Sequence, residues 1–199
     1  MKKTTIMLFA CLLGACGQPT AEDPATAESA AVPVSTVAVY EAAVANDARP
    51  AADRARDAQR RPGAVLEFLG VAPGMKVLDM FSGGGYYTEI LSYVVGDGGM
   101  VVAQSSKAYL DFVGEEFEQR YLGGRLPNTE ILMAENNELS LEPGSFDVIM
   151  LVLAFHDLYF ENADGGWPAI DVDAFLAELF SGLRAGGIVG IVDHYAADG

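Results

Sequence analysis

Apolar residues follow two alternating patterns along most of the chain, and these patterns predict strands and helices in turn. Short, almost continuous apolar runs are typical of strands buried on both faces, and they occupy 76–80, 100–103, 129–133, 146–153 and 188–192. Between several of them, apolar residues recur at helical spacing, over 86–95, 107–121 and 172–183. Strands joined by helical crossovers predict an α/β fold with a doubly wound parallel sheet.

Three shorter helices are expected before the first strand, at 37–44, from about Pro50 to Arg61, and at 63–69. In the second of these, opposite charges stand four residues apart and are expected to pair on an exposed face. These pairs are Arg49 with Asp53, and Asp57 with Arg61.

The beginning of the chain lacks both patterns and resembles that of an exported bacterial lipoprotein. Two lysines precede an apolar stretch over 4–13, which is too short to cross a bilayer as a helix. The sequence Leu-Gly-Ala-Cys at 13–16 then resembles a lipoprotein box. This resemblance implies a signal peptide over 1–15, a lipid attached to Cys16, and anchoring to a membrane of the cell envelope.

Residues 16–36 are rich in Ala, Thr, Pro, Glu and Ser, without apolar periodicity, and are expected to form a flexible tether. The folded domain is then expected over 37–199. Both cysteines of the chain, Cys11 and Cys16, precede it, so we expect neither disulfide nor thiolate chemistry within the domain.

The charge balance argues against one class of partner. The chain has 12 Lys and Arg against 28 Asp and Glu, a net charge of −16, and its basic residues are scattered. Binding to a phosphate backbone depends on clustered basic side chains. We therefore expect no nucleic-acid partner.

The first long strand is followed by a loop suited to close approach of a ligand. Asp79 stands near the end of that strand, and Gly83, Gly84 and Gly85 lead into the next helix. Consecutive glycines allow backbone amides to come near a bound group, and ligands of doubly wound sheets bind beyond the strands' carboxyl ends.

At these positions the sequence resembles the class I S-adenosylmethionine-dependent methyltransferases. Asp79, Gly83 and Gly85 match the first motif of that family, while Phe81 replaces its first glycine. Further matches are the acidic loop residue Glu135, the Gly-Ser-Phe-Asp sequence at 144–147, and the Leu-x-x-Gly-Gly sequence at 183–187, whose residues 184–187 we expect to form a turn. These motifs fit the family in order and spacing from about Pro73 to Val192.

The resemblance implies S-adenosylmethionine as the cofactor and assigns residues to its parts. Asp79 and the three glycines, Gly83 to Gly85, would lie beside the methionine end. Gln104 stands where the family has an acid that binds the ribose hydroxyls, and an amide is a weaker acceptor for them. Glu135 would lie beside the adenine amino group.

Two histidine–aspartate pairs follow neighbouring strands of the expected sheet. His156 precedes Asp157 after the fourth strand, and His194 follows Asp193 after the fifth. Three interpretations remain open. One histidine is a general base for a substrate hydroxyl or amine, the four side chains hold a divalent metal, or the histidines only shape a polar pocket.

The leading hypothesis is a lipid-anchored methyltransferase that methylates an oxygen or nitrogen of a small or membrane-associated acceptor. Export separates the domain from the cytosolic cofactor, so a non-enzymatic ligand-binding lipoprotein on the same fold is the alternative, and a metal-dependent enzyme using the His–Asp residues is a third. The family continues after the fifth strand, whereas this sequence stops at Gly199. We therefore expect either a fragment or another segment covering that strand's edge.

Overall fold

The computed structural model describes residues 36–121 and 123–195. The expected signal peptide, the lipidation site at Cys16 and residues 16–35 of the expected tether lie outside the described residues. They remain predictions.

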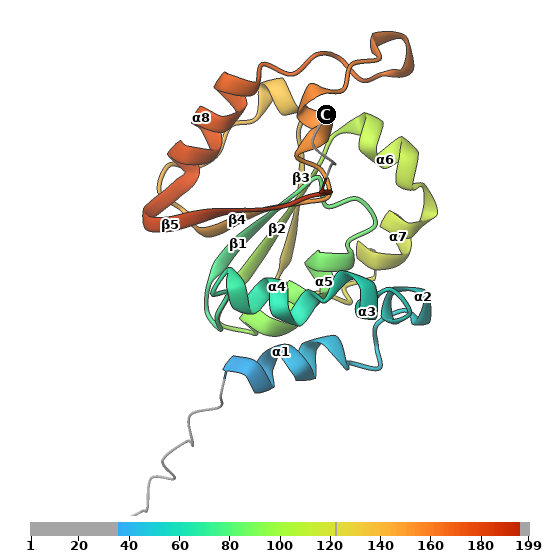
Figure 1. The fold of residues 1–199 in the computed structure, drawn as a ribbon, viewed down its shortest axis with the longest axis vertical. Helices are drawn as coiled ribbons and strands as arrows, with labels where there is room; N and C mark the ends of the chain where they lie inside the picture. Colours follow the sequence, from blue (N-terminus) through green and yellow to red (C-terminus); the bar gives the residue numbers. More distant parts are fainter. Residues whose placement is uncertain (1–35, 122, 196–199) are drawn as a thin grey trace, which may run out of the picture. The chain divides into compact units, whose positions relative to one another are not determined.

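Five strands form one parallel sheet in the order β3-β2-β1-β4-β5 (Figure 1). They are β1 (Lys76–Met80), β2 (Met100–Ser105), β3 (Thr129–Met133), β4 (Phe146–Val152) and β5 (Leu183–Val192). The chain runs outward from β1 through β2 to β3, and then returns to the other side of β1 at β4. This order confirms the doubly wound α/β fold and places its switch point between β1 and β4.

Helices cover both faces of the sheet, with α4 and α5 on one face and α8 on the other (Figure 1). The helices are α1 (Thr36–Val44), α2 (Ala51–Arg54), α3 (Asp57–Arg60), α4 (Pro62–Phe68), α5 (Tyr86–Val95), α6 (Lys107–Val113), α7 (Glu115–Tyr121) and α8 (Val172–Gly182). Alternate residues of each strand face opposite sides. Val77 therefore packs in the core with α4 and α5, while Leu78 packs in the core with α8.

Three expected elements differ from the structure. The segment 107–121 forms two helices, because Gly114 between them has φ 59° and ψ −130°, a non-helical backbone that ends α6. The helix expected from Pro50 is likewise divided into α2 and α3. The expected turn at 184–187 lies within β5, where the pairing with β4 shifts register.

The prediction that opposite charges of the early helices pair on an exposed face is wrong. Arg49 is buried and binds both carboxylate oxygens of Asp57 at 2.8 Å, while Asp53 binds Arg120 of α7 at 2.5 Å. Arg49 precedes α2, and Arg61, with φ 48°, ends α3, so neither expected pair lies within one helix. The resulting long-range ion pair fastens α2 to α7, beside the glycine-rich loop.

Candidate functional site

Two pockets lie beyond the carboxyl ends of the strands, and Phe81 lines both. The first, which we term the glycine-loop pocket, has a volume of about 460 Å³ and is bordered by Asp79, Arg60 and the loop residues 82–84. The second, which we term the Trp167 pocket, has a volume of about 160 Å³. Their position agrees with the rule for ligand sites in doubly wound sheets.

Asp79 is a buried carboxylic acid in the wall of the glycine-loop pocket. The Thr88 hydroxyl of α5 donates a hydrogen bond of 2.6 Å to Asp79 Oδ2. Burial raises the pKa of Asp79 to about 7, although the Thr88 hydrogen bonds oppose that rise. A buried acid with one hydroxyl donor has the capacity to accept a cation from a ligand.

The loop glycines permit close packing under α7. Gly85 has φ 77°, and a Cβ at this position would lie 2.6 Å from the Tyr121 hydroxyl oxygen. A Cβ at Gly84 would collide with the Glu116 side chain, also of α7. Gly83 and Gly84 also line the glycine-loop pocket. The structure thus requires a glycine at position 85 for packing, besides any ligand contact.

Phe81 adopts a backbone conformation that is uncommon for a residue with a side chain. Its φ is 52°, in the left-handed region that favours glycine. Its ring is buried, with ring centroids 5.5 Å from Tyr109 and 6.0 Å from Phe175. The aromatic packing offsets the cost of the left-handed backbone and forms a partition between the two pockets.

Gln104 does not line either pocket, contrary to its expected place beside a ribose. It is fully buried, and its Oε1 accepts the Phe81 N–H at 3.1 Å. Its Nε2 donates to the Ala134 carbonyl at 2.8 Å and to Asn136 Oδ1 at 3.3 Å. Since both ends of the amide are engaged inside the protein, Gln104 holds the Phe81 loop in place.

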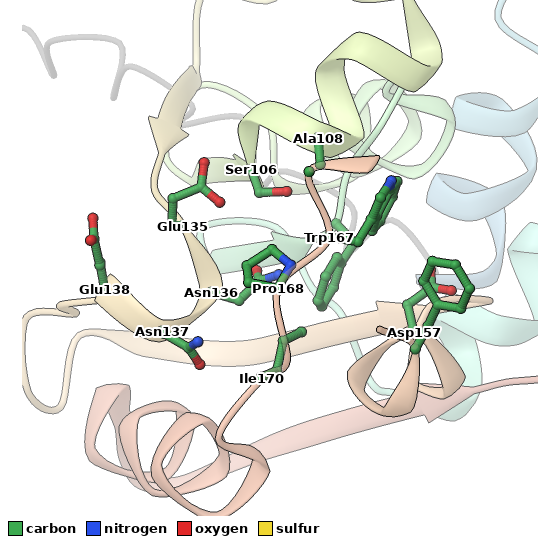
Figure 2. A pocket seen from close by; sticks show the side chains of 13 residues that line it. Ser106, Ala108, Glu135, Asn136, Asn137, Glu138, Asp157, Trp167, Pro168 and Ile170 are labelled. Carbon is green, nitrogen blue, oxygen red and sulfur yellow. The ribbon is translucent and has the colours of Figure 1, made fainter. Parts of the chain in front are cut away.

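Glu135 lies in the Trp167 pocket, where the adenine end of the cofactor is expected. Its Oε1 accepts the backbone N–H of Lys107 at 3.0 Å. Figure 2 shows Glu135 and Asn136 on one side of this pocket and Asp157 on the other, with Trp167 between them. A contact of Glu135 with adenine stays a prediction.

The two histidine–aspartate pairs meet beyond β4 and β5, as expected. His156 Nδ1 lies 2.9 Å from Asp193 Oδ1, and the His156 backbone N–H donates to Asp193 Oδ2 at 2.9 Å. His156 Nε2 lies 3.4 Å from Asp157 Oδ1, and the ring centroids of His156 and His194 are 5.6 Å apart. Asp193 therefore orients the ring and leaves Nε2 on the other side.

Tyr109 of α6 contacts residues of both pockets and Asp157 beside His156. This residue was not predicted from the sequence. Its hydroxyl donates to Asp157 Oδ2 at 3.3 Å, and its ring packs against Phe81 and, at 5.7 Å, Trp167. Burial raises the pKa of Tyr109, and the negative charge of Asp157 and the hydrogen bond to it raise this pKa further. The hydroxyl of Tyr109 therefore stays a neutral donor. Its place on the inner face of an expected helix was its only signal in the sequence.

The arginines of the glycine-loop pocket were also not predicted from the sequence. Arg56 and Arg60 line it together with Asp79, and Tyr87 is a further lining residue. Burial raises the pKa of Tyr87 to about 12, with Arg60 lowering and Asp79 raising it in addition. Five of the chain's 12 basic residues fall within 49–61, a local cluster that an assessment of overall charge passes over.

These residues fit the methionine end of S-adenosylmethionine, which carries an ammonium and a carboxylate. The carboxyl group of Asp79 suits the first, and the positive charge on the same pocket wall suits the second. By contrast, residues 36–121 and 123–195 contain no group of three or more His, Cys, Asp or Glu side chains suited to a metal ion. Within the same residues, no helix is long and apolar enough to cross a membrane.

Comparisons with known proteins point to the same chemistry. Residues 52–112 match the family model of protein-L-isoaspartate (D-aspartate) O-methyltransferases. The chain is 27% identical over 124 residues to a ubiquinone/menaquinone biosynthesis C-methyltransferase from Shewanella piezotolerans, and 28% identical to that of Shewanella halifaxensis. Each match covers 62% of this chain and 44% of the relative, so the chain spans less than half the length of these relatives.

Solved structures agree with the fold. A SAM-dependent methyltransferase from Aquifex aeolicus superposes with a TM-score of 0.54 at 27% identity, covering 69% of this chain and 68% of its own. The YcgJ protein from Bacillus subtilis gives a TM-score of 0.52 at 20% identity, covering 69% and 52%. Together the comparisons confirm the methyltransferase fold and support S-adenosylmethionine as the cofactor.

Proposed function

We propose that this chain is an S-adenosylmethionine-dependent methyltransferase that methylates an oxygen or nitrogen of a small or membrane-associated acceptor. The observation that carries the proposal is the meeting of two features at one edge of the sheet. β4 pairs with β1, which bears Asp79, and with β5, which leads to Asp193. The glycine-loop pocket and the His156–Asp193 pair therefore lie beyond adjoining strands.

The glycine-loop pocket holds the methionine end of the cofactor. When bound, S-adenosylmethionine supplies a methyl group on a sulfonium. Asp79 accepts hydrogen bonds from the ammonium group, and Phe81 separates this end from the Trp167 pocket, where Glu135 faces the adenine end. The role of these residues is to fix the methyl group in line with an acceptor, which is the main requirement of such a transfer.

His156 takes the proton that the acceptor loses. Asp193 engages Nδ1, so Nε2 is the ring nitrogen that meets an acceptor O–H or N–H. As the acceptor atom forms its bond to the methyl carbon, the methyl–sulfur bond breaks and the acceptor proton passes to Nε2. The other product is the neutral thioether S-adenosylhomocysteine.

The aromatic side chains around the Trp167 pocket suit the adenine ring of the cofactor. Phe160 and Trp167 both line this pocket and pack with ring centroids 5.8 Å apart. Such rings stack on a flat group and exclude water from it. The curated relatives are named C-methyltransferases, so product analysis must distinguish an acceptor carbon from oxygen or nitrogen.

Membrane anchoring forms a separate part of the proposal, supported by the Leu-Gly-Ala-Cys sequence at 13–16. Expression in a bacterium fed labelled palmitate tests it. We expect label in the wild-type chain and none in the Cys16→Ser variant. Equal labelling of both would contradict lipidation at Cys16.

Methyl transfer is tested with S-adenosylmethionine carrying a labelled methyl group and a panel of phenols and aromatic amines. We expect acceptor-dependent formation of S-adenosylhomocysteine, reduced on the order of a hundredfold in His156→Asn. Equal turnover in that variant would remove the base role from His156. Cofactor binding without transfer would favour the alternative of a ligand-binding lipoprotein. That alternative is supported by Gln104, because its amide is hydrogen-bonded inside the protein to Phe81 and Ala134.

A further inference from the structure

Three arginines surround the ring of Tyr86, the first residue of α5. The guanidinium carbons lie 5.3, 5.1 and 4.7 Å from the ring centroid for Arg49, Arg56 and Arg60, respectively. Guanidinium groups at this distance gain cation–π attraction from the ring. Tyr86 is itself held, because its hydroxyl donates to Asp57 at 2.6 Å.

Two of these arginines are already neutralised. Arg49 is buried and forms a two-point ion pair with Asp57, and Arg56 is paired with Asp53. Arg60 has no carboxylate within 4.0 Å in the part of the chain that the structure describes. It is partly exposed and lines the glycine-loop pocket, so its donors remain available there.

Arg60 and Asp79 give the glycine-loop pocket two opposite charges. A ligand group that satisfies both must itself carry an anion and a cation within one small unit. The α-amino acid end of the cofactor has this property. A guanidinium also matches a carboxylate through two parallel hydrogen bonds, which an ammonium side chain does not.

We propose that Arg60 binds the α-carboxylate of the methionine end of the cofactor, and thereby selects ligands that carry an amino acid end. The proposal rests on the proposed function. Arg60 comes from α3, outside the strand–loop–helix unit that bears Asp79 and the glycines. Cofactor binding therefore joins the early helices to the sheet.

The test compares two ligands by calorimetric titration of the full chain. S-adenosylhomocysteine has the amino acid end, and 5′-methylthioadenosine lacks it. We expect Arg60→Gln to weaken S-adenosylhomocysteine about tenfold or more, which is the usual effect of losing a charge-assisted hydrogen bond. Affinity for 5′-methylthioadenosine should stay within about twofold. Arg61→Gln removes the same charge from an exposed neighbour outside the pocket and should change neither affinity.

Different outcomes separate the two proposals. If Arg60→Gln binds S-adenosylhomocysteine as the wild type does, or weakens both ligands equally, the role of Arg60 is overturned and the proposed function stands. If the folded wild type binds neither ligand, the proposed function falls and this assignment with it. Should Arg60→Gln fail to fold, a third ligand decides: decarboxylated S-adenosylhomocysteine keeps the ammonium that Asp79 receives and lacks only the carboxylate. The wild type should bind it at least about tenfold more weakly than S-adenosylhomocysteine, and equal affinity would overturn the role of Arg60.

Discussion

Asp193 contacts both the ring and the backbone of His156. His156 Nδ1 lies 2.9 Å from Oδ1 and 3.0 Å from Oδ2, and the His156 N–H donates to Oδ2 at 2.9 Å. Burial alone would raise the pKa of Asp193, but the N–H donors of His194 and His156, and then the His156 ring, lower it below its ordinary value. Asp193 is thus a carboxylate at neutral pH that fixes the ring of the proposed base.

The Asp193→Asn variant tests this orientation. An amide keeps the shape of the side chain but removes the charge that faces Nδ1. We expect single-turnover methyl transfer to slow by roughly tenfold to a hundredfold, no more than in His156→Asn, with cofactor affinity unchanged. Asp164→Asn, at an exposed loop position, is the matched control. A loss of cofactor affinity equal to the loss of rate would assign Asp193 to binding instead.

Cofactor affinity should depend on pH through Asp79. Because its pKa is raised to about 7, the carboxylate that accepts the ammonium group is mostly protonated at pH 6 and mostly ionised at pH 8. The dissociation constant should therefore be about tenfold larger at pH 6 than at pH 8. Asp79→Asn should bind weakly and without this dependence. A flat profile in the wild type would mean that Asp79 does not receive the ammonium.

The same acid should destabilise the ligand-free protein at higher pH. A raised pKa means that the folded state holds a proton that the unfolded state has lost between about pH 4 and pH 7. The contribution of Asp79 to the free energy of unfolding therefore falls as pH rises through that window and is constant above it. Asp79→Asn should be more stable than the wild type at pH 8, by about 1 kcal/mol or more, and the difference should shrink at pH 5. Urea unfolding at both pH values measures this, and a difference that does not change with pH would contradict it.

Phe81 allows a comparison between backbone strain and packing. Phe81→Ala removes the buried ring and should lower the free energy of unfolding by about 3 kcal/mol or more. Phe81→Gly loses the same ring but relieves the left-handed backbone at φ 52°, so it should be roughly 1 kcal/mol more stable than Phe81→Ala. Urea unfolding of both variants checks the order. A glycine variant less stable than the alanine variant would show that the backbone at this position is not strained.

Local apolar patterns along the sequence were sufficient to predict the strands of the sheet. The limits of β1, α5 and β3 match those expected, because their apolar runs end at turn residues such as the Gly-Asp-Gly-Gly sequence at 96–99. The meeting of His156 with Asp193 also followed, since parallel strands bring their carboxyl ends to one edge. Sequence alone thus located the edge of the sheet where the site lies.

The direction in which single side chains point could not be read from the same patterns. Gln104 occupies the expected position on β2, yet its amide turns inward to Phe81 and Ala134. The partners of Asp53 and Asp57 depend on where α2 begins and α3 ends and on the distant Arg120. Such contacts are tertiary, and the spacing of residues along the chain does not predict them.

The most direct test of the central claim is calorimetric titration of the purified full chain with S-adenosylmethionine, beside Asp79→Asn and the exposed control Asp97→Asn. The account predicts saturable binding by the wild type and by Asp97→Asn at pH 8, with binding at least about tenfold weaker in Asp79→Asn. Absence of binding by a wild-type chain that unfolds cooperatively would contradict it.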